Sequence, residues 1–586
     1  MPRSKFLRAA LALLASLALG APALPQTERV SVSSSGGEGN EDSWETTISA
    51  DGRWITFVSL ADDLVPGDTN GVRDDFVRDR LSGQTLRISV SSSGEQGDGT
   101  SGGPAVSGDG RWVAFYSSAS NLVPGDTNDA WDVFVRDLAA GTTERVSLSS
   151  SGVQADLDSS LPAISHAGRW VVFASDATNL VAGDTNGVRD VFVRDRLALV
   201  TERVSVSTQG AQANNRSSGV AVSADGRYVS FASFADTLVA GDTNGAVDVF
   251  VRDRAAGAIW RVSVDDAGTQ GDGHSGYDPA TGFMLTGLSA DGRFVLFNSL
   301  ASNLVAGDAN GVMDVFVHEL ASGRTSCASL APDLSFGNGR SLSTHSPAIS
   351  ADGRFVAFHS WASNLVTGDT NAVADCFRRD RLIGSTERLS LDSAGMQGNG
   401  DSGYAVLSAD GRFAAFHSDA TNLVAGDGNA ALDAFVRDTG GACAPAASYC
   451  TAKVNSQGCT PSVGFSGVPS ATPKAPFVLK ATGLVNQKSG LCFYSLAGAA
   501  GVPFQGGWLC VQGPIARTAA ASTGGNPLPE DCSGMLAYDF NERIQSGMDP
   551  GLVAGVRVWG QFWSRDPSSG PPGTSLSDAV QFEVCP

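Results

Sequence analysis

The feature that most constrains this chain is a short motif, SADGR or a close variant, that occurs seven times. The third residue of the motif falls at Asp51, Asp109, Ala167, Asp225, Asp291, Asp352 and Asp410. The spacings are 58, 58, 58, 66, 61 and 58 residues. A repeat of this length, made of short apolar runs broken by Gly and Asp, indicates the β units of a propeller or solenoid.

Each repeat predicts four short strands, as the second one illustrates. We expect strands over 104–107, 111–117, 132–137 and 143–149. The sequence Gly108-Asp109-Gly110 predicts a tight turn between the first two strands, because Gly and Asp tolerate the left-handed backbone conformation. The second strand, RWVAFYS, has apolar residues on both faces, which is typical of a sheet packed between two neighbours.

The two ends of the repeat region predict a closed ring. In the seventh repeat no strand like TERVSV follows the third strand, which is expected over 434–438. Such a strand does occur before the first repeat, over 27–34. Pairing these two segments would complete the last blade and remove an open sheet edge. The sequence therefore predicts a seven-bladed β-propeller over 27–441 that an N-terminal strand closes.

The order of the motifs within each unit resembles a known repeat family. SADGR with an apolar strand, then DVFVRD, then TERVSV, is similar to the WD40-like (PD40) repeats of TolB-type propellers over 27–441. The resemblance implies the propeller fold but no single function, since such repeats serve periplasmic scaffolds, peptidase gates and enzymes. The units are longer than usual for TolB-like blades, and the small domain that precedes the propeller in TolB has no counterpart. The Tol-system role is therefore not carried over.

One loop of constant length has the composition of a cation site. It follows the pattern Asp-x-Asn-x-x-x-Asp, and its first Asp lies 17 residues after the third SADGR position in all seven units. Oxygen ligands at this spacing suit weak calcium sites, although the acidic fifth position and the bidentate Glu of an EF-hand loop are missing. Alternatively, the same residues cap the turn by accepting backbone N–H groups. The residues are Asp68, Asn70, Asp74, Asp126, Asn128, Asp132, Asp184, Asn186, Asp190, Asp242, Asn244, Asp248, Asp308, Asn310, Asp314, Asp369, Asn371, Asp375, Asp427, Asn429 and Asp433.

The long loops are expected on one face of the ring. Strands alternate in direction within a blade, so the second-to-third and fourth-to-first connections open on the same side. The largest insertions precede the fifth repeat (265–288) and the sixth repeat (331–346). They mark a recognition patch or are tolerated surface insertions.

No catalytic residues are predicted. His359 and His417 occupy equivalent positions at the end of the second strand, where the other units have Val58, Tyr116, Ala174, Ala232 and Asn298. This pair is interpreted as a ligand-binding pocket in adjacent blades or as two hydrogen-bonded strand-end histidines. No third metal ligand lies at a recognisable spacing.

The N-terminus has the pattern of an export signal. Residues 1–23 combine three basic side chains, an apolar run over 9–19 and a small-x-small cleavage site at Ala21-Pro22-Ala23. The alternative, an uncleaved anchor, is disfavoured because the run is too short to span a bilayer. The formal charge of −21 disfavours binding to nucleic acid or anionic lipid. We expect an exported monomer that is secreted, periplasmic or on the cell surface.

Composition changes near residue 441. Residues 27–441 contain no lysine and two cysteines, whereas 442–586 contain four lysines and seven cysteines. Disulfides are expected in an exported domain, and the odd cysteine number leaves one thiol free or paired elsewhere. Short apolar runs over 477–481, 491–495, 508–511, 556–563 and 579–584 predict a β-sandwich.

Two tryptophans of this second domain form a candidate ligand surface. Trp559 and Trp563 lie on the same face of one predicted strand, which is otherwise polar. They would form a platform for sugar rings or belong to a second packed face.

These observations favour an exported, non-catalytic binding or scaffold protein that recognises a protein or a glycan through the loop-rich face. The alternative is a polysaccharide-active hydrolase or lyase with its acids in the propeller cleft. An enzyme would need a few groups there that differ from their counterparts in the other blades.

Overall fold

The computed structural model describes residues 26–344, 347–440, 446–467, 469, 476–552, 556–570 and 573–584. The predicted export signal, residues 1–23, lies outside this part of the chain. Contacts between residues divide the protein into two compact units, with the boundary between Ala442 and Cys443. Within the described residues no helix is long and apolar enough to cross a membrane.

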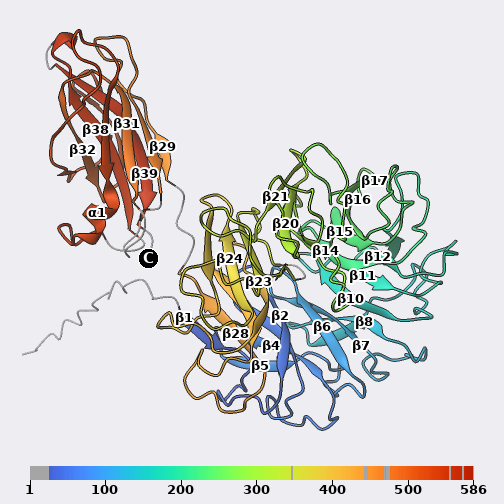
Figure 1. Ribbon diagram of the computed structural model, residues 1–586. Helices are drawn as coiled ribbons and strands as arrows, with labels where there is room; N and C mark the ends of the chain where they lie inside the picture. The colour runs from blue at the N-terminus through green and yellow to red at the C-terminus, as the bar shows by residue number, and fades with distance from the viewer. Residues whose placement is uncertain are drawn as a thin grey trace, which may run out of the picture. The chain divides into compact units, whose positions relative to one another are not determined.

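The first unit is a β-propeller of seven four-stranded antiparallel sheets, as predicted (Figure 1). The first, innermost strands are β2 (Ser43–Ile48), β6 (Ser101–Val106), β10 (Ser159–Ile164), β14 (Ser217–Val222), β18 (Thr286–Leu288), β22 (Ser341–Leu342) and β26 (Ser402–Leu407). The second strands are β3 (Trp54–Ser59), β7 (Trp112–Ser117), β11 (Trp170–Ser175), β15 (Tyr228–Ser233), β19 (Phe294–Ser299), β23 (Phe355–Ser360) and β27 (Phe413–Ser418).

The third and fourth strands complete each blade on its outer side. The third strands are β4 (Asp74–Asp79), β8 (Asp132–Asp137), β12 (Asp190–Asp195), β16 (Asp248–Asp253), β20 (Asp314–Glu319), β24 (Asp375–Asp380) and β28 (Asp433–Asp438). The fourth strands are β5 (Gln84–Arg87), β9 (Thr142–Arg145), β13 (Val200–Arg203), β17 (Ala258–Arg261), β21 (Arg324–Cys327), β25 (Ser385–Arg388) and, in the seventh blade, β1 (Gln26–Arg29).

The predicted ring closure is confirmed. Strand β1 pairs antiparallel with β28, from Gln26 opposite Asp438 to Arg29 opposite Phe435. The outer strands are shorter than predicted, with four residues each. In the second blade the chain leaves the sheet after Arg145 and forms a separate bridge between Leu148 and Gln154, which directs it toward the next blade.

Apolar side chains between neighbouring blades form the core of the ring. In the first two blades, Val77 and Ile88 pack against Val113 and Phe115 of the next sheet. A fully buried Phe from the second strand stacks on one from the third strand, as Phe115 does on Phe134 at 5.7 Å. Burial of each such ring contributes about 1.5–3 kcal/mol. The repeated pattern thus explains why every blade adheres to the next.

The C-terminal unit contains two sheets around one core. The larger sheet comprises β29 (Ala447–Tyr449), β32 (Ser489–Ser495), β35 (Ala516–Arg517), β36 (Ala521–Ser522), β38 (Arg557–Arg565) and β39 (Thr574–Glu583). The smaller sheet comprises β30 (Ser462–Ser466), β31 (Val478–Leu484) and β37 (Gly534–Asp539), and a hairpin is formed by β33 (Ala499–Phe504) and β34 (Gly507–Val511). A single turn of helix, α1 (Phe540–Gln545), and a 3-10 turn, η1 (Pro567–Ser569), complete the unit.

Two disulfides are formed among the described residues of this unit. Cys450 is bonded to Cys510, and Cys459 to Cys532. Cys492 is a free, buried thiol. Cys443 and Cys585 lie outside the described residues. The prediction of a disulfide-containing β-domain is confirmed, and the bonds link segments 60 and 73 residues apart.

Candidate functional site

The Asp-x-Asn-x-x-x-Asp loops lie at the start of each third strand, where their acids meet an arginine of the same blade. In the second blade, Arg145 Nη1 lies 3.0 Å from Asp126 Oδ1 and 3.0 Å from Asp132 Oδ2. Asn128 Nδ2 donates to Asp132 Oδ2 at 2.9 Å, and the Ser147 hydroxyl donates to the other oxygen. We call this group the Asp–Arg–Asp cluster.

Six blades contain this cluster. The arginines are Arg87, Arg145, Arg203, Arg261, Arg388 and, from β1, Arg29. Within the described residues, no three carboxylate, imidazole or thiol side chains are grouped as metal ligands would be. In these six blades a guanidinium lies between the two acids of the loop, and the calcium sites remain a prediction.

The fifth blade differs from the other six. Cys327 occupies the position of the arginine, and Phe336 occupies the position that Gln154 has in the second blade. Asp314 still accepts hydrogen bonds from Ser329 and Asn310. Burial raises the pKa of Asp314 to about 6, and no cation is among the groups that oppose this shift.

The first strands carry a bulge on the loop-rich face of the ring that directs side chains toward the axis. The register shifts between Trp44 and Thr47 in the first blade, and likewise in the third and seventh blades. Glu45, Leu161 and Tyr404 adopt positive φ angles of 52°, 53° and 53° at these bulges. All three line one end of a central channel. We call this end the loop-face mouth.

Acidic and aromatic groups gather at the mouth between the first two blades. Gly103 N–H donates to Glu45 Oε2 at 3.1 Å. Asp75 is fully buried, and neither carboxylate oxygen has a hydrogen-bond partner among the described residues. Burial raises the pKa of Asp75 well above its usual range and raises that of Glu45, while the nearby Arg73 opposes both shifts. Burial also raises the pKa of Tyr116 to about 12.

The histidine pair flagged by the sequence also lies at this mouth, on either side of Tyr404. The Tyr404 ring centroid is 4.9 Å from that of His417 and 6.2 Å from that of His359. Burial lowers the pKa of His359 to about 4 and that of His417 to about 3. Both imidazoles are therefore neutral at pH 7, and within the described residues neither Nδ1 has a hydrogen-bond partner. Trp361 lies 5.4 Å from His359 and is 38% exposed.

The insertion before the fifth blade contributes to the same face. It folds into a small hairpin with a bridge between Tyr277 and Met284. Tyr277 packs edge-on against Phe234 at 5.3 Å and against His274 at 5.4 Å. Asp278 of this hairpin is close enough to raise the pKa of Tyr404 electrostatically. The insertion before the sixth blade includes residues 345–346, which lie outside the described part of the chain.

Sequence reasoning found the histidines but missed Glu45, Arg73, Asp75 and Tyr404. The sequence does contain a sign of this site, because Asp75 stands at a position that is Val, Cys or Ala in the other third strands. The Cys376 and Ala434 positions show that this site otherwise accepts only small apolar side chains.

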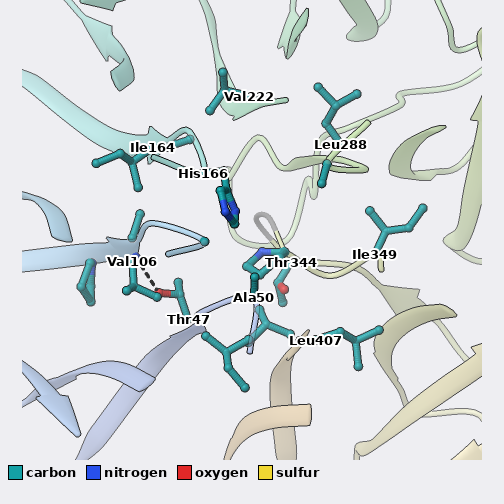
Figure 2. A pocket seen from close by; sticks show the side chains of 18 of the residues that line it. Thr47, Ala50, Val106, Ile164, His166, Val222, Leu288, Thr344, Ile349 and Leu407 are labelled. Atoms are coloured by element: carbon teal, nitrogen blue, oxygen red, sulfur yellow. Dashed lines mark hydrogen bonds between the residues drawn. The ribbon is translucent and has the colours of Figure 1, made fainter. Parts of the chain in front are cut away.

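The loop-face mouth opens into the central channel, which has a cavity volume of about 430 Å³. Seven aliphatic side chains, one per blade, line the channel (Figure 2). Each lies in the sequence three residues before the third position of the SADGR motif of its blade. This aliphatic ring consists of Ile48, Val106, Ile164, Val222, Leu288, Ile349 and Leu407.

The two candidate tryptophans of the C-terminal unit are half-buried. Trp559 and Trp563 pack with Leu509 and Val511 of the β33–β34 hairpin. Trp563 Nε1 donates to Gln505 Oε1 at 3.2 Å. The hairpin thus contacts the face that sequence reasoning considered as a sugar platform.

Comparisons with known proteins give distant likenesses to solved structures. No protein-family model matches the chain. No curated protein matches it either. TolB from Acinetobacter baumannii is 15% identical with a TM-score of 0.29, over 49% of this chain and 53% of that one. This match spans about half the length of the TolB chain.

Two other solved structures show the same distant likeness. Oligogalacturonate lyase from Vibrio parahaemolyticus is 10% identical with a TM-score of 0.40, over 68% of this chain and 90% of that one. Acylaminoacyl peptidase from Pyrococcus horikoshii is 8% identical with a TM-score of 0.40, over 76% of this chain and 59% of that one. No specific function of this chain follows from these likenesses.

Proposed function

We propose that this chain is an exported, non-catalytic binding protein that holds a carbohydrate chain at the loop-face mouth of the propeller. One observation carries the proposal. The seven units repeat their structural residues, yet at the mouth they differ, and the differences place aromatic and charged side chains together. Tyr404, His417, Trp361, Tyr116 and Trp131 are the aromatic members of this group.

The chemistry of the mouth suits sugars. An aromatic ring offers a flat apolar face to the C–H groups of a pyranose, and charged groups at its edge form strong hydrogen bonds with hydroxyls. Arg340 lies 4.0 Å over the Trp361 ring, and Arg73 lies 5.9 Å from the Trp131 ring. In each pair a guanidinium lies over one face of the aromatic ring, so that a hydrogen-bond donor and an aromatic ring are close together. A protein ligand is the alternative, and it would leave a panel of polysaccharides unbound.

Export is part of the proposal. The two disulfides favour an oxidising compartment outside the cytoplasm. The predicted signal over residues 1–23 would direct the chain there. Secretion, a periplasmic location and display on the cell surface are equally compatible with these features.

A second candidate function is polysaccharide cleavage at the same mouth. It is favoured by Glu45 and Asp75, two carboxyls whose pKa values are both raised by burial. Perturbed acids in a cleft are typical of proton-transfer sites. In this case Glu45, which lines the channel, would be the acid in contact with substrate.

Binding to a panel of soluble polysaccharides, measured by affinity electrophoresis and calorimetry, tests the proposal. Trp361→Ala is expected to weaken binding roughly three- to tenfold through the loss of one stacking surface. Trp260→Ala is the matched control, because Trp260 is 44% exposed on the outer strand β17, away from the mouth. An equal effect of both variants, or no glycan binding, would refute the carbohydrate site. Release of new reducing ends that Glu45→Gln abolishes would establish the enzyme instead.

A further inference from the structure

The central channel has features that the proposed carbohydrate site does not use. The aliphatic ring surrounds the axis at one level, and Figure 2 shows six of its members, from Val106 to Leu407, around the cavity. Val222 and Leu407 are 9% and 1% exposed. The volume of about 430 Å³ is within the range of small-molecule pockets.

The end of the channel on the tight-turn face is lined by small residues. Ala50, Ala224, Ala290, Ala351 and Ala409 share one register position there, and Gly108 occupies it in the second blade. In the third blade the same position is His166, which is exposed and lies over Gly108. The channel therefore has an imidazole at this end and Glu45 and Tyr404 at the loop-face mouth.

Backbone groups along the channel wall are paired between blades. Ala50 N–H donates to the Gly108 carbonyl at 3.0 Å, and Ala409 N–H donates to the Ala50 carbonyl at 2.9 Å. Similar bonds join Ala224 to Ala290 and Ala351 to Ala409. The inner edges of the sheets thus form hydrogen bonds with each other at this level.

Three prolines and the hydroxyl of Thr47 further reduce the number of free backbone N–H groups along the channel wall. Pro104, Pro162 and Pro347 line the channel at one register position and have no N–H group. Val106 N–H donates to the Thr47 hydroxyl at 3.2 Å. Water needs two to four polar partners to be stable in a cavity, and apolar cavities bind apolar molecules in its place. The wall of the aliphatic ring offers few such partners.

We propose that the channel binds the alkyl chain of a single-chain amphiphile whose uncharged polar headgroup lies at the loop-face mouth. A ring of aliphatic side chains around an axis fits a linear chain better than a branched or planar molecule. The volume is roughly three times that of a 150 Å³ apolar cavity that holds one benzene. The negative charge of the protein disfavours an anionic headgroup. This inference stands independently of the carbohydrate proposal, although both ligands would approach through the same mouth.

Calorimetry with alkyl β-glucosides of increasing chain length, each below its micelle concentration, tests the inference. We expect affinity to rise about fourfold with each added methylene until the channel is full, and then to level off. Val222→Phe, which fills the channel, is expected to reduce the affinity for the longer chains at least tenfold. Ala140→Phe, in an exposed turn of the second blade, is the control and should change nothing.

A second variant and a second ligand separate this inference from the proposed function. Ile349→Ala widens the channel at one level without lengthening it, so it should weaken the binding of linear chains and leave the plateau at the same chain length, which a general loss of folding would not do. Val222→Phe should weaken the binding of free 1-octanol as it weakens the binding of the longer glucosides. Trp361→Ala should leave the binding of 1-octanol unchanged. Affinity that is independent of chain length, or insensitive to Val222→Phe, would overturn the inference. Loss of glycan binding with octanol binding intact would contradict only the carbohydrate proposal.

Discussion

Six blades of the propeller place a guanidinium between two aspartates, and the fifth places a cysteine there. The backbone is the same in both cases, since each third strand has six residues and pairs with the second strand in the same register. The arginine is therefore not needed to shape the blade. In the second blade burial raises the pKa of Asp126 and Arg145 opposes that shift, whereas for its counterpart in the fifth blade, Asp308, only a backbone hydrogen bond from Asn310 opposes the effect of burial.

The seventh blade lies between these two cases. Its arginine, Arg29, is shared among Glu38, Asp427 and Asp433, and burial raises the pKa of Asp433 to about 6 despite this partner. Asp242 of the fourth blade behaves in the same way, since burial raises its pKa to about 6 although Arg261 is its partner. The arginine therefore opposes the effect of burial on these pKa values without cancelling it. In six blades the constant spacing of the acids places both of them against the same arginine.

The largest effect is expected from removal of an arginine. Arg145→Ala leaves Asp126 and Asp132 without a cation and should lower the free energy of unfolding by about 3–5 kcal/mol. Cys327→Ala, the equivalent change in the fifth blade, should cost about 1 kcal/mol. Urea unfolding followed by tryptophan fluorescence measures both. Equal losses would show that the arginine has no special role.

The fifth blade should make stability depend on pH. The pKa of Asp314 is raised from an ordinary value near 3.8 to about 6, so the folded state binds its proton more tightly than the unfolded state. The contribution of Asp314 to the free energy of unfolding is fully present below pH 4. It is lost as the pH rises through 6, by about 3 kcal/mol in total. The free energy of unfolding, measured from pH 4 to pH 8 in the wild type and in Asp314→Asn, isolates the contribution of Asp314. Parallel curves for the two proteins would contradict it.

Restoring the cluster in the fifth blade should have a smaller, opposite effect. Cys327→Arg combined with Phe336→Gln supplies the missing cation and amide, and should stabilise the protein at pH 8 by about 1 kcal/mol because desolvation of the new guanidinium offsets most of the gain. In the same variant the free energy of unfolding should depend less on pH between pH 4 and pH 7 than in the wild type. Cys327→Lys with Phe336→Gln is the control for charge without the planar guanidinium. A less stable double variant would show that the fifth blade is adapted to its apolar partners.

The smallest effect is expected from a chelator. The acids of six loops already contact an arginine, so EDTA should leave the midpoint of thermal unfolding unchanged within about 1 °C. A drop of many degrees that calcium restores and magnesium does not would instead establish the loops as calcium sites.

The fold could be predicted almost completely from the sequence because it is repeated. The bounds of β8 agree with the predicted 132–137, and the closing strand was found from a missing partner in the last unit. The mouth was predicted only in part. A strand pattern with period two assigns Glu45 to a fixed face, whereas the bulge between Trp44 and Thr47 directs it to the axis. The partner of Asp132 was missed because Arg145 belongs to a different strand, which only the fold brings close.

Ring closure has a consequence for the time course of folding. The Arg437 guanidinium donates to the Thr27 hydroxyl across 410 residues of sequence, and β1 finds its place only against β28. A chain that is synthesised from its N-terminus therefore delivers its first strand long before the partner of that strand exists. Blades one to six can assemble in order as they emerge, but the ring stays open until the seventh repeat arrives. The last event of folding thus joins the oldest and the newest parts of the propeller.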